Sequence, residues 1–202
     1  MRLVVDWDGT ITVRDSLVQV IHEFGDPALL RALEPRVGVD LTLHEEIAAE
    51  FAAITAPLEE VVAWVVENVE VRPGLDELAE LAPLVISAGF HELIEPVLAR
   101  EGIELEVLAN RVDVRPDGWR VRFRDEAACA TCGEPCKRGS VAGEPYVYVG
   151  DGYSDRCAAL AADRVVARDA LARHLDRIGA PYESFDDLHD VVTLVRGTPH
   201  TL

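Results

Sequence analysis

The sequence predicts an α/β fold, in which helices cover a parallel β-sheet and a separate helical region is inserted after the first strand. Three observations support this prediction. A buried strand, Arg2–Val5, begins the chain and ends at a pair of aspartates. Helical periodicity then continues, without a convincing strand, to about Asn68. From there strands alternate with helices, which favours a parallel sheet with right-handed crossovers.

The composition excludes several classes of function. With 202 residues, 49% hydrophobic and 28% charged, the chain is typical of a soluble globular protein of one domain with an insertion, or of two small domains. The net charge of −18 argues against nucleic acid or a membrane surface as a partner. No segment approaches the ~18–20 apolar residues of a transmembrane helix. Asp6 and Asp8 interrupt the only place for a signal-peptide core. We expect a cytoplasmic protein that is a monomer or a homodimer.

The helical region begins near Asp15, after which apolar residues recur at helix spacing. Thr42 and Glu45 form a capping-box pattern ahead of a second apolar series. Pro57 stands where a third helix can begin. The chain is therefore expected to divide into a helical cap at residues 15–72 and an α/β core made of residues 1–14 and 73–202.

The core elements follow from period and from turn residues. Pro116, Asp117 and Gly118 interrupt an alternating segment, which indicates a small β-hairpin. Ser87-Ala88-Gly89 is expected to be a turn, and Pro181–Ser184 to be irregular. In chain order we expect helix Leu75–Leu81, strand Leu84–Ile86, helix His91–Arg100, strand Leu105–Leu108, the hairpin Arg111–Arg124, a short helix after Cys136, strand Tyr146–Val149, helix Ser154–Ala161, strand Arg164–Ala167, helix Ala170–Ile178 and helix Asp186–Val195.

The most informative motif is Asp-Trp-Asp-Gly-Thr at residues 6–10, directly after the first strand. Alternate side chains of a strand point the same way, so Asp6 and Asp8 should emerge together at its carboxyl end. Gly9 lets the backbone turn sharply. Two carboxylates in this arrangement can divide the chemistry, one attacking a substrate while the other transfers protons. The alternative is a strand that runs into an ordinary Asp/Gly turn.

Further polar side chains lie near the ends of two later strands. Chemistry collects at the carboxyl ends of the strands in a parallel sheet, and these groups suit a hard, oxygen-seeking cation such as Mg²⁺. A cation and a lysine would also offset the repulsion between clustered acids and an anionic substrate. Taken singly, each residue can also be a cap, a turn residue or a surface lysine. The residues are Ser87, Lys137, Asp151 and Asp155.

The motif at residues 6–10, then Ser87, Lys137 and the Gly-Asp-Gly-Tyr-Ser-Asp motif at residues 150–155, resemble in order the four motifs of the haloacid dehalogenase superfamily. The helical insertion resembles the cap of its phosphoserine-phosphatase-like branch, on a Rossmann-like core. A closer resemblance is to the methionine-salvage phosphatases that act on 2-hydroxy-3-keto-5-methylthiopentenyl 1-phosphate. The stretches that support it are Ile11–Asp15, the cysteine-rich loop before Lys137, Val166–Asp169 and Pro181–Phe185.

This resemblance implies a Mg²⁺-dependent phosphatase that hydrolyses a small phosphate monoester through an aspartyl-phosphate. Asp6 would be the nucleophile, and Asp8 would protonate the leaving alkoxide and then activate water. The implied metal ligands are the Asp6 carboxylate, the Asp8 backbone carbonyl and Asp151, with Asp155 in support. The implied substrate-binding residues are Ser87, Ala88, Gly89, Lys137 and Asp15.

Asp15 lies nine residues after Asp6, where phosphoserine phosphatases carry a glutamate that holds the substrate amine. It can contact substrate, or it can only cap a helix that starts near Ser16. The expected partner is a small phosphorylated metabolite, with the methionine-salvage enol phosphate first. The alternatives are phosphoserine, phosphoethanolamine and a vitamin phosphate.

Three of the four cysteines, Cys129, Cys132 and Cys136, fall within eight residues. Their thiolates can bind Zn²⁺ with Cys157 or water as the fourth ligand. Alternatively, Cys129 and Cys132 form a redox-labile pair, or the thiols pack a small loop. A non-enzymatic, metal-binding interaction module is a further alternative, but it requires a second CxxC or CxxH element that the sequence lacks.

Overall fold

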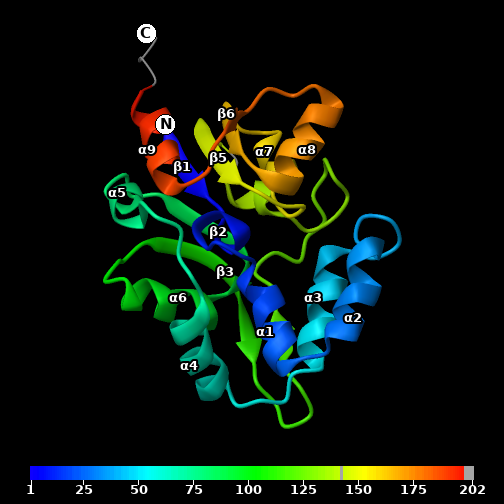
Figure 1. Cartoon of the computed structure of the whole chain (residues 1–202). Coiled ribbons are helices and arrows are strands. Elements are labelled where there is room, and N and C mark those ends of the chain that lie inside the picture. Colours follow the sequence, from blue (N-terminus) through cyan, green and yellow to red (C-terminus); the bar gives the residue numbers. More distant parts are fainter. Residues whose placement is uncertain (142, 198–202) are drawn as a thin grey trace.

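The computed structural model of this chain describes residues 1–141 and 143–197. The described part forms a seven-stranded sheet in the order β4-β3-β2-β1-β5-β6-β7 (Figure 1). All neighbouring strands are parallel except β3 and β4, which form the predicted hairpin. The predicted α/β fold is therefore confirmed. The strands are β1 (Arg2–Val5), β2 (Leu84–Phe90), β3 (Glu106–Asp113), β4 (Arg120–Arg122), β5 (Tyr146–Gly150), β6 (Arg164–Ala167) and β7 (Glu183–Ser184).

Helices cover both faces of the sheet, as a parallel sheet requires (Figure 1). Successive residues of β1 point to opposite faces, so Leu3 and Val5 join one apolar core and Val4 the other. The helices are α1 (Ser16–Phe24), α2 (Pro27–Leu33), α3 (Leu43–Ala52), α4 (Leu58–Asn68), α5 (Leu75–Ala79), α6 (His91–Arg100), α7 (Arg156–Ala159), α8 (Asp169–Ile178) and α9 (Leu188–Arg196). Shorter helical turns are η1 (Trp7–Ile11), η2 (Glu34–Arg36) and η3 (Lys137–Ser140).

The helices α1–α4 lie between β1 and β2 in the chain. The residues predicted to begin three of these helices are found at their starts. The side chain of Asp15 caps α1 by accepting a hydrogen bond from Val18 N at 3.0 Å. Thr42 and Glu45 form both hydrogen bonds of a capping box at the start of α3. Pro57 directly precedes α4. Within the described residues, none of the helices is long and apolar enough to span a membrane.

The helical region enters and leaves the core at one place. Val13 N donates a hydrogen bond to Glu70 O at 2.9 Å, and Arg72 N donates to Ile11 O at 2.8 Å. The two chain segments therefore run antiparallel at the root of residues 15–72. Figure 1 shows α1, α2 and α3 grouped together, whereas α4 lies beside the core helix α6.

Two local predictions were wrong. Ser87-Ala88-Gly89 is not a turn beyond the strand but part of β2, which continues to Phe90 with a shifted register against β3. The side chain of Asn110 on β3 donates to Ala88 O at 2.7 Å and keeps this irregular segment attached to the sheet. The segment Pro181–Ser184, expected to be irregular, contains the short edge strand β7. Its Glu183 forms an ion pair with Arg164 of β6.

Candidate active site

The aspartate-rich motif leaves β1 at the centre of the sheet. Asp6 is buried, and its backbone N–H donates to Val149 O at 2.9 Å, which continues the pairing of β1 with β5. The chain then turns through Gly9, whose φ of +77° lies in the left-handed region. A Cβ at this position would collide with the carboxylate of Asp151. Glycine is therefore required here both by the backbone conformation and by the close approach of the Asp151 loop.

Arg72 holds this turn from the root of the helical region. Its side chain is buried, and its guanidinium donates to Thr10 O and Gly9 O, each at 3.0 Å, and to Asp186 O at 3.1 Å. Several backbone carbonyls of the turn therefore share one cation. In the sequence, Arg72 marks only the end of the predicted insertion. No local pattern distinguishes a buried arginine of this kind from a surface one.

Lys137 lies between two carboxylates. Its Nζ is 2.5 Å from Asp6 Oδ1 and 2.7 Å from Asp155 Oδ1, and all three side chains are buried. Asp155 Oδ1 also accepts a hydrogen bond from Tyr148 Oη at 2.7 Å. Asp155 Oδ2 accepts from the backbone N–H groups of Asp151 at 3.0 Å and Gly152 at 2.8 Å. Asp155 therefore joins β5, the loop after it and Lys137. Tyr148 was not predicted as a site residue, because the strand pattern around it indicates only a core residue.

Asp8 has hydrogen-bond partners that differ from those of this ion pair. Its Oδ1 accepts hydrogen bonds from the backbone N–H of Ser16, at 3.0 Å, and from the Ser16 hydroxyl. Its Oδ2 accepts from Ser87 Oγ at 3.2 Å, and Ser87 Oγ accepts in turn from Gly89 N at 2.8 Å. A Cβ at Gly89 would approach Asp8 Oδ2 to 3.0 Å, so a small residue keeps this space open.

The buried acids lack sufficient positive charge. Burial, followed by repulsion from Asp155, raises the pKa of Asp6 well above its ordinary value. Burial also raises the pKa of Asp8, although the hydrogen bonds from Ser16 oppose the change. Burial and the charge of Asp155 raise the pKa of Asp151 to about 7. Burial disfavours the charge of Lys137, but Asp155 and Asp6 outweigh this effect and raise its pKa. One lysine does not neutralise this group of carboxylates.

A hard divalent cation fits this shortage of positive charge. Asp6, Asp151 and Asp155 each offer an oxygen, and these oxygens lie within 4.8 Å of one another. Thr10 Oγ1 donates to Asp151 Oδ1 at 2.8 Å and orients that carboxylate. Both oxygens of Asp155 already accept two hydrogen bonds each, which leaves Asp6 and Asp151 with more free acceptor capacity. An all-oxygen donor set of this kind suits Mg²⁺. The Asp8 carboxylate does not belong to this group of oxygens.

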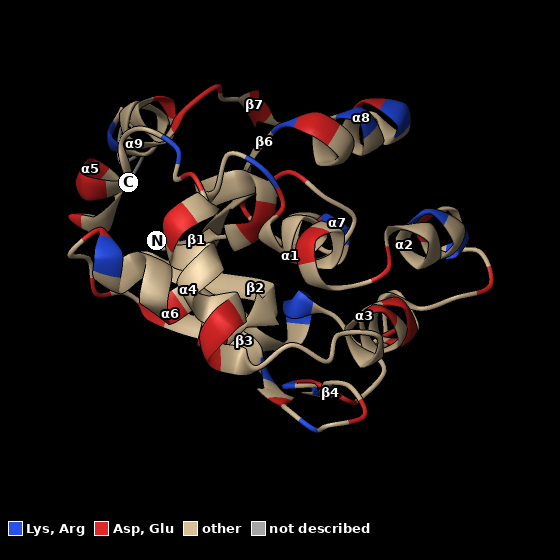
Figure 2. Cartoon of the chain, turned by 60° about the horizontal axis from the view of Figure 1, so that its bottom comes forward, with Lys and Arg blue, Asp and Glu red and all other residues tan. Residues whose placement is uncertain are grey.

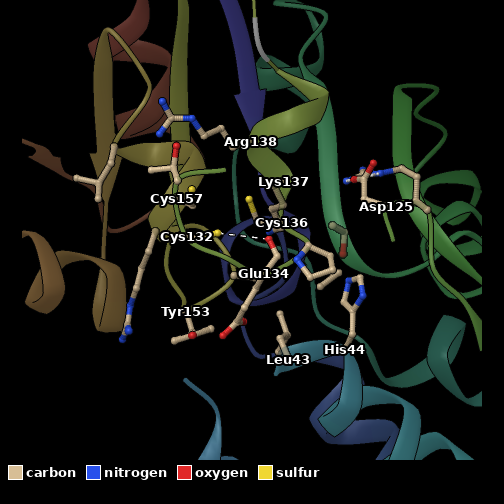
Figure 3. Close-up of a pocket in the computed structure, with 18 of the residues that line it drawn as sticks. Leu43, His44, Asp125, Cys132, Glu134, Cys136, Lys137, Arg138, Tyr153 and Cys157 are labelled. Carbon is tan, nitrogen blue, oxygen red and sulfur yellow. Dashed lines mark hydrogen bonds and ion pairs between the residues drawn. The ribbon is translucent and has the colours of Figure 1, made fainter. Parts of the chain in front are cut away.

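A cavity of about 300 Å³ opens beside Ser87, Ala88 and Lys137 (Figure 3). Leu43 and His44 of α3 line it from the helical region, and the cysteine-bearing loop lines another wall. Asp15 does not line this cavity. Its side chain caps α1, so the predicted role as a helix cap is confirmed. Contact between Asp15 and the substrate stays a prediction. The structure thus brings Ser87, Ala88 and Lys137 to the edge of a space large enough for a small molecule.

The four cysteines come together although Cys157 is distant in the sequence. The Sγ atoms of Cys129, Cys132, Cys136 and Cys157 all lie within 4.8 Å of one another. Cys157 comes from α7, and the other three come from the loop that precedes Lys137. All four are free thiols in this structure.

The fold and the site together define a class of protein, in which the strand ends of a parallel sheet bring carboxylates, a lysine and a serine to one edge. The sequence profile described as haloacid dehalogenase-like hydrolase matches residues 3–160. The chain therefore belongs to this family, and membership implies Mg²⁺ as the cofactor.

Curated relatives are similar over nearly the whole chain. The chain is 25% identical to the 2-hydroxy-3-keto-5-methylthiopentenyl-1-phosphate phosphatase of Brevibacillus brevis, over 96% of this chain and 94% of that protein. The relative of the same name from Bacillus cereus strain AH187 is also 25% identical, with the same coverage. The bifunctional enzyme MtnB/MtnX of Bacillus licheniformis is 25% identical over 97% of this chain but only 49% of its own length.

Solved structures share the fold. Phosphoserine phosphatase from T. onnurineus has a TM-score of 0.72 and 20% identity, covering 98% of this chain and 95% of that one. A phospho-aspartyl intermediate analogue of phosphoserine phosphatase has a TM-score of 0.71 and 16% identity, covering 95% of this chain and 97% of that one. These structures show the fold, and the family match together with the curated relatives confirms the predicted phosphatase class.

Proposed function

We propose that this phosphatase hydrolyses a compact phosphate monoester through an aspartyl-phosphate formed on Asp6. The observation that carries the proposal is the placement of Asp6 and Asp8. Both follow β1, Asp6 beside Lys137 and Asp8 between Ser16 and Ser87. Their different partners suit them to different roles in one reaction.

In the first step an Asp6 oxygen attacks phosphorus, and the bond from phosphorus to the alcohol oxygen breaks. Asp8, whose pKa is raised by burial, donates its proton to the leaving oxygen. In the second step the Asp8 carboxylate takes a proton from water as the water oxygen attacks phosphorus. Asp6 is released as a free carboxylate, and inorganic phosphate leaves.

The remaining residues bind and orient the phosphoryl group. Ser87 Oγ and Lys137 Nζ would donate to its oxygens, replacing part of their present hydrogen bonds to Asp8 and Asp6. Asp6, Asp151 and the Asp8 carbonyl would hold Mg²⁺, with Asp155 supporting the loop. When bound, Mg²⁺ offsets the negative charge that gathers on the phosphoryl oxygens.

Helices α1–α3 are suited to act as a cap over the strand ends. The chain enters and leaves residues 15–72 through one pair of antiparallel segments, and Trp119 of the β3–β4 hairpin also holds this region by donating hydrogen bonds to Ile54 O and Ala56 O. Closure would exclude water from the reacting groups and would admit only small molecules. In the view of Figure 2, acidic segments are spread over most of the described helices and basic segments are interspersed among them. This distribution disfavours a large polyanionic substrate.

The first candidate substrate is 2-hydroxy-3-keto-5-methylthiopentenyl 1-phosphate, named in several of the curated relatives. Leu43 and Pro135 line the cavity, and His44 stacks on Phe123 with ring centroids 3.8 Å apart. These groups suit an apolar methylthio tail better than a sugar or a peptide.

An amine-bearing monoester such as phosphoserine or phosphoethanolamine is the second candidate. Glu46 and Glu50 of α3 are both buried, and Glu50 Oε1 has no hydrogen-bond partner among the described residues. Burial, repulsion from Glu46 and then repulsion from Asp15 raise the pKa of Glu50 to about 8. A substrate ammonium near these acids would relieve that repulsion.

A turnover screen tests both the mechanism and the substrate. Purified protein with Mg²⁺ is offered the enol phosphate, phosphoserine, phosphoethanolamine, a vitamin phosphate and a phosphopeptide, and kcat/KM is measured for each. We expect the enol phosphate to exceed the others by at least about tenfold. Equal turnover of the phosphopeptide would contradict the capped pocket.

The nearly isosteric substitution Asp6→Asn removes the nucleophile and should lower kcat by at least about a thousandfold. Asp163→Asn, outside the site, is the matched control. Activity of Asp6→Asn within tenfold of the wild type would overturn the covalent mechanism.

A further inference from the structure

The cysteine cluster is independent of the proposed reaction. Its sulfurs form a group of potential metal ligands separate from Asp6, Asp151 and Asp155, and the reaction proposed for Asp6 and Asp8 uses no thiol. The cluster instead joins two segments that are far apart in the chain. We propose that Cys129, Cys132, Cys136 and Cys157 bind one structural Zn²⁺ ion, which ties the loop preceding Lys137 to helix α7.

The distances between the sulfurs support a metal site rather than a disulfide. Cys129 Sγ and Cys157 Sγ are 3.9 Å apart, and all four Sγ atoms lie within 4.8 Å of one another. A disulfide requires about 2.05 Å between its sulfurs. Four thiolates at about 2.3 Å from a tetrahedral Zn²⁺ lie about 3.8 Å from one another. Four sulfur ligands also close the site to water, which is typical of a structural zinc.

The loop geometry supports the same conclusion. The backbone N–H of Thr131 donates to Cys129 Sγ at 3.4 Å, so the turn directs a donor at the first sulfur. Gly133 N donates to Cys129 O at 2.8 Å, and Cys129 N donates to Glu134 O at 2.9 Å. Gly133, with φ +80° and open space around it, closes this tight turn. The Cys-x₂-Cys pair is therefore already folded with both sulfurs within 4.8 Å of those of Cys136 and Cys157. Figure 3 shows the sulfurs of Cys132, Cys136 and Cys157 close together.

Arg124 fastens the start of the loop to β3 by donating hydrogen bonds to Asn110 Oδ1 and Leu108 O, but beyond it the loop buries little apolar surface. Among the described residues from 124 to 136, no side chain belongs to either apolar core. The segment between β4 and η3 also contains no regular element. Such a loop gains most of its order from a cross-link, because it buries too little apolar surface to offset its conformational entropy.

The surrounding charge suits a tetrathiolate site. Zn²⁺ with four thiolates carries a net charge of −2, which nearby cations stabilise. Arg138 lies two residues after Cys136, and Arg156 directly precedes Cys157. Both arginines line the cavity beside the cluster. The Arg156 guanidinium lies 4.5 Å from the centroid of the Tyr153 ring, and its Nε is buried without a hydrogen-bond partner among the described residues.

Two of the proposed zinc ligands lie close to residues of the candidate active site in the sequence. Cys136 directly precedes Lys137, and Cys157 lies two residues after Asp155. Lys137 and Asp155 are joined by the 2.7 Å ion pair. A zinc ion bound by both cysteines would fix the backbone on each side of that ion pair.

Elemental analysis of untagged protein, purified without chelator and without added metal, tests the proposal. We expect about one zinc per chain in the wild type. The double variant Cys129→Ser, Cys132→Ser should lose most of this zinc and melt at a lower temperature. Thr131→Ser, an exposed change in the same loop, should retain the full zinc content. Zinc content is read without turnover, so this result is separate from success or failure of the proposed reaction.

A second measurement covers the case in which the double variant fails to fold. Wild-type protein produced in zinc-poor medium with cobalt should show the absorption of a tetrahedral cobalt thiolate complex. Folded wild-type protein with no metal and four titratable thiols would overturn the proposal. A chain lighter by two hydrogens, which would indicate a disulfide, or one iron per chain in place of zinc, would also overturn it.

Discussion

Replacing Asp155 by Asn tests whether this carboxylate compensates the buried charge of Lys137. Each oxygen of Asp155 accepts two hydrogen bonds: Oδ1 from Lys137 and Tyr148, and Oδ2 from the backbone of Asp151 and Gly152. Asn has nearly the same shape but only one acceptor oxygen. It can keep both backbone hydrogen bonds only if its amide nitrogen faces Lys137 and Tyr148.

The size of the effect follows from these partners. The Tyr148 hydroxyl can rotate and accept from the new amide, but the Lys137 ammonium meets another donor and retains only Asp6. Breaking a buried ion pair costs about 3–5 kcal/mol when the remaining charge has no other partner. Because Lys137 keeps its ion pair with Asp6, we expect the lower end of this range, about 3 kcal/mol. In a chain of 202 residues each kcal/mol changes Tm by about 2–4 °C. The expected decrease in Tm is therefore about 6–12 °C.

Thermal unfolding followed by circular dichroism, near neutral pH and without added metal, measures this change. The matched control is Asp40→Asn, which removes the exposed ion pair of Arg36 and should cost no more than about 1 kcal/mol. A decrease below about 3 °C for Asp155→Asn would refute the idea that Asp155 compensates Lys137.

Three further predictions concern the metal, the first turn and a buried acid. Chelation should abolish phosphatase activity, and Mg²⁺ should restore it. Ca²⁺ should restore little activity, because its longer bonds and larger coordination shell spoil the in-line geometry. Full activity in excess chelator would contradict the proposed metal site. Gly9→Ala should weaken Mg²⁺ binding, measured by titration calorimetry, because its Cβ would displace Asp151. The matched control is Gly102→Ala, since Gly102 has a similar φ of +70° and no atom within 4 Å of the place that a Cβ would take. This control should lose only about 1–2 kcal/mol of stability from the backbone and keep its Mg²⁺ affinity. Equal Mg²⁺ affinity of the two variants would argue against the close approach of Asp151 to Gly9. The raised pKa of Glu50, about 8 against an ordinary 4.5, means that the folded protein keeps a proton which the unfolded chain releases. Stability should therefore fall as the pH rises between these values, and Glu50→Gln should reduce this fall in Tm; an unchanged pH profile would show that Glu50 ionises normally.

Elements that depend on near neighbours in the chain were predictable from the sequence. The Thr42–Glu45 capping box, the Asp15 cap of α1 and the hairpin around Asp117 each involve residues a few positions apart, so a short pattern carries the whole signal. Strand β1 and the order of alternating strands and helices were predictable for the same reason. The aspartates that follow β1 and β5 could be named as candidates because the ends of strands can be read from the sequence.

Contacts between distant segments were decided by the tertiary structure. The order of the sheet places β1 between β2 and β5, and this order brings the loop of Asp151 against Gly9 and Lys137 against Asp6. The role of Arg72, the continuation of β2 through Ser87 and the approach of Cys157 to the other cysteines also depend on it. By itself the sequence determined which faces are apolar and where strands end, because period and turn residues are local properties. Only the packed sheet decided which buried charges meet, because the partner of a buried side chain depends on which strands are neighbours.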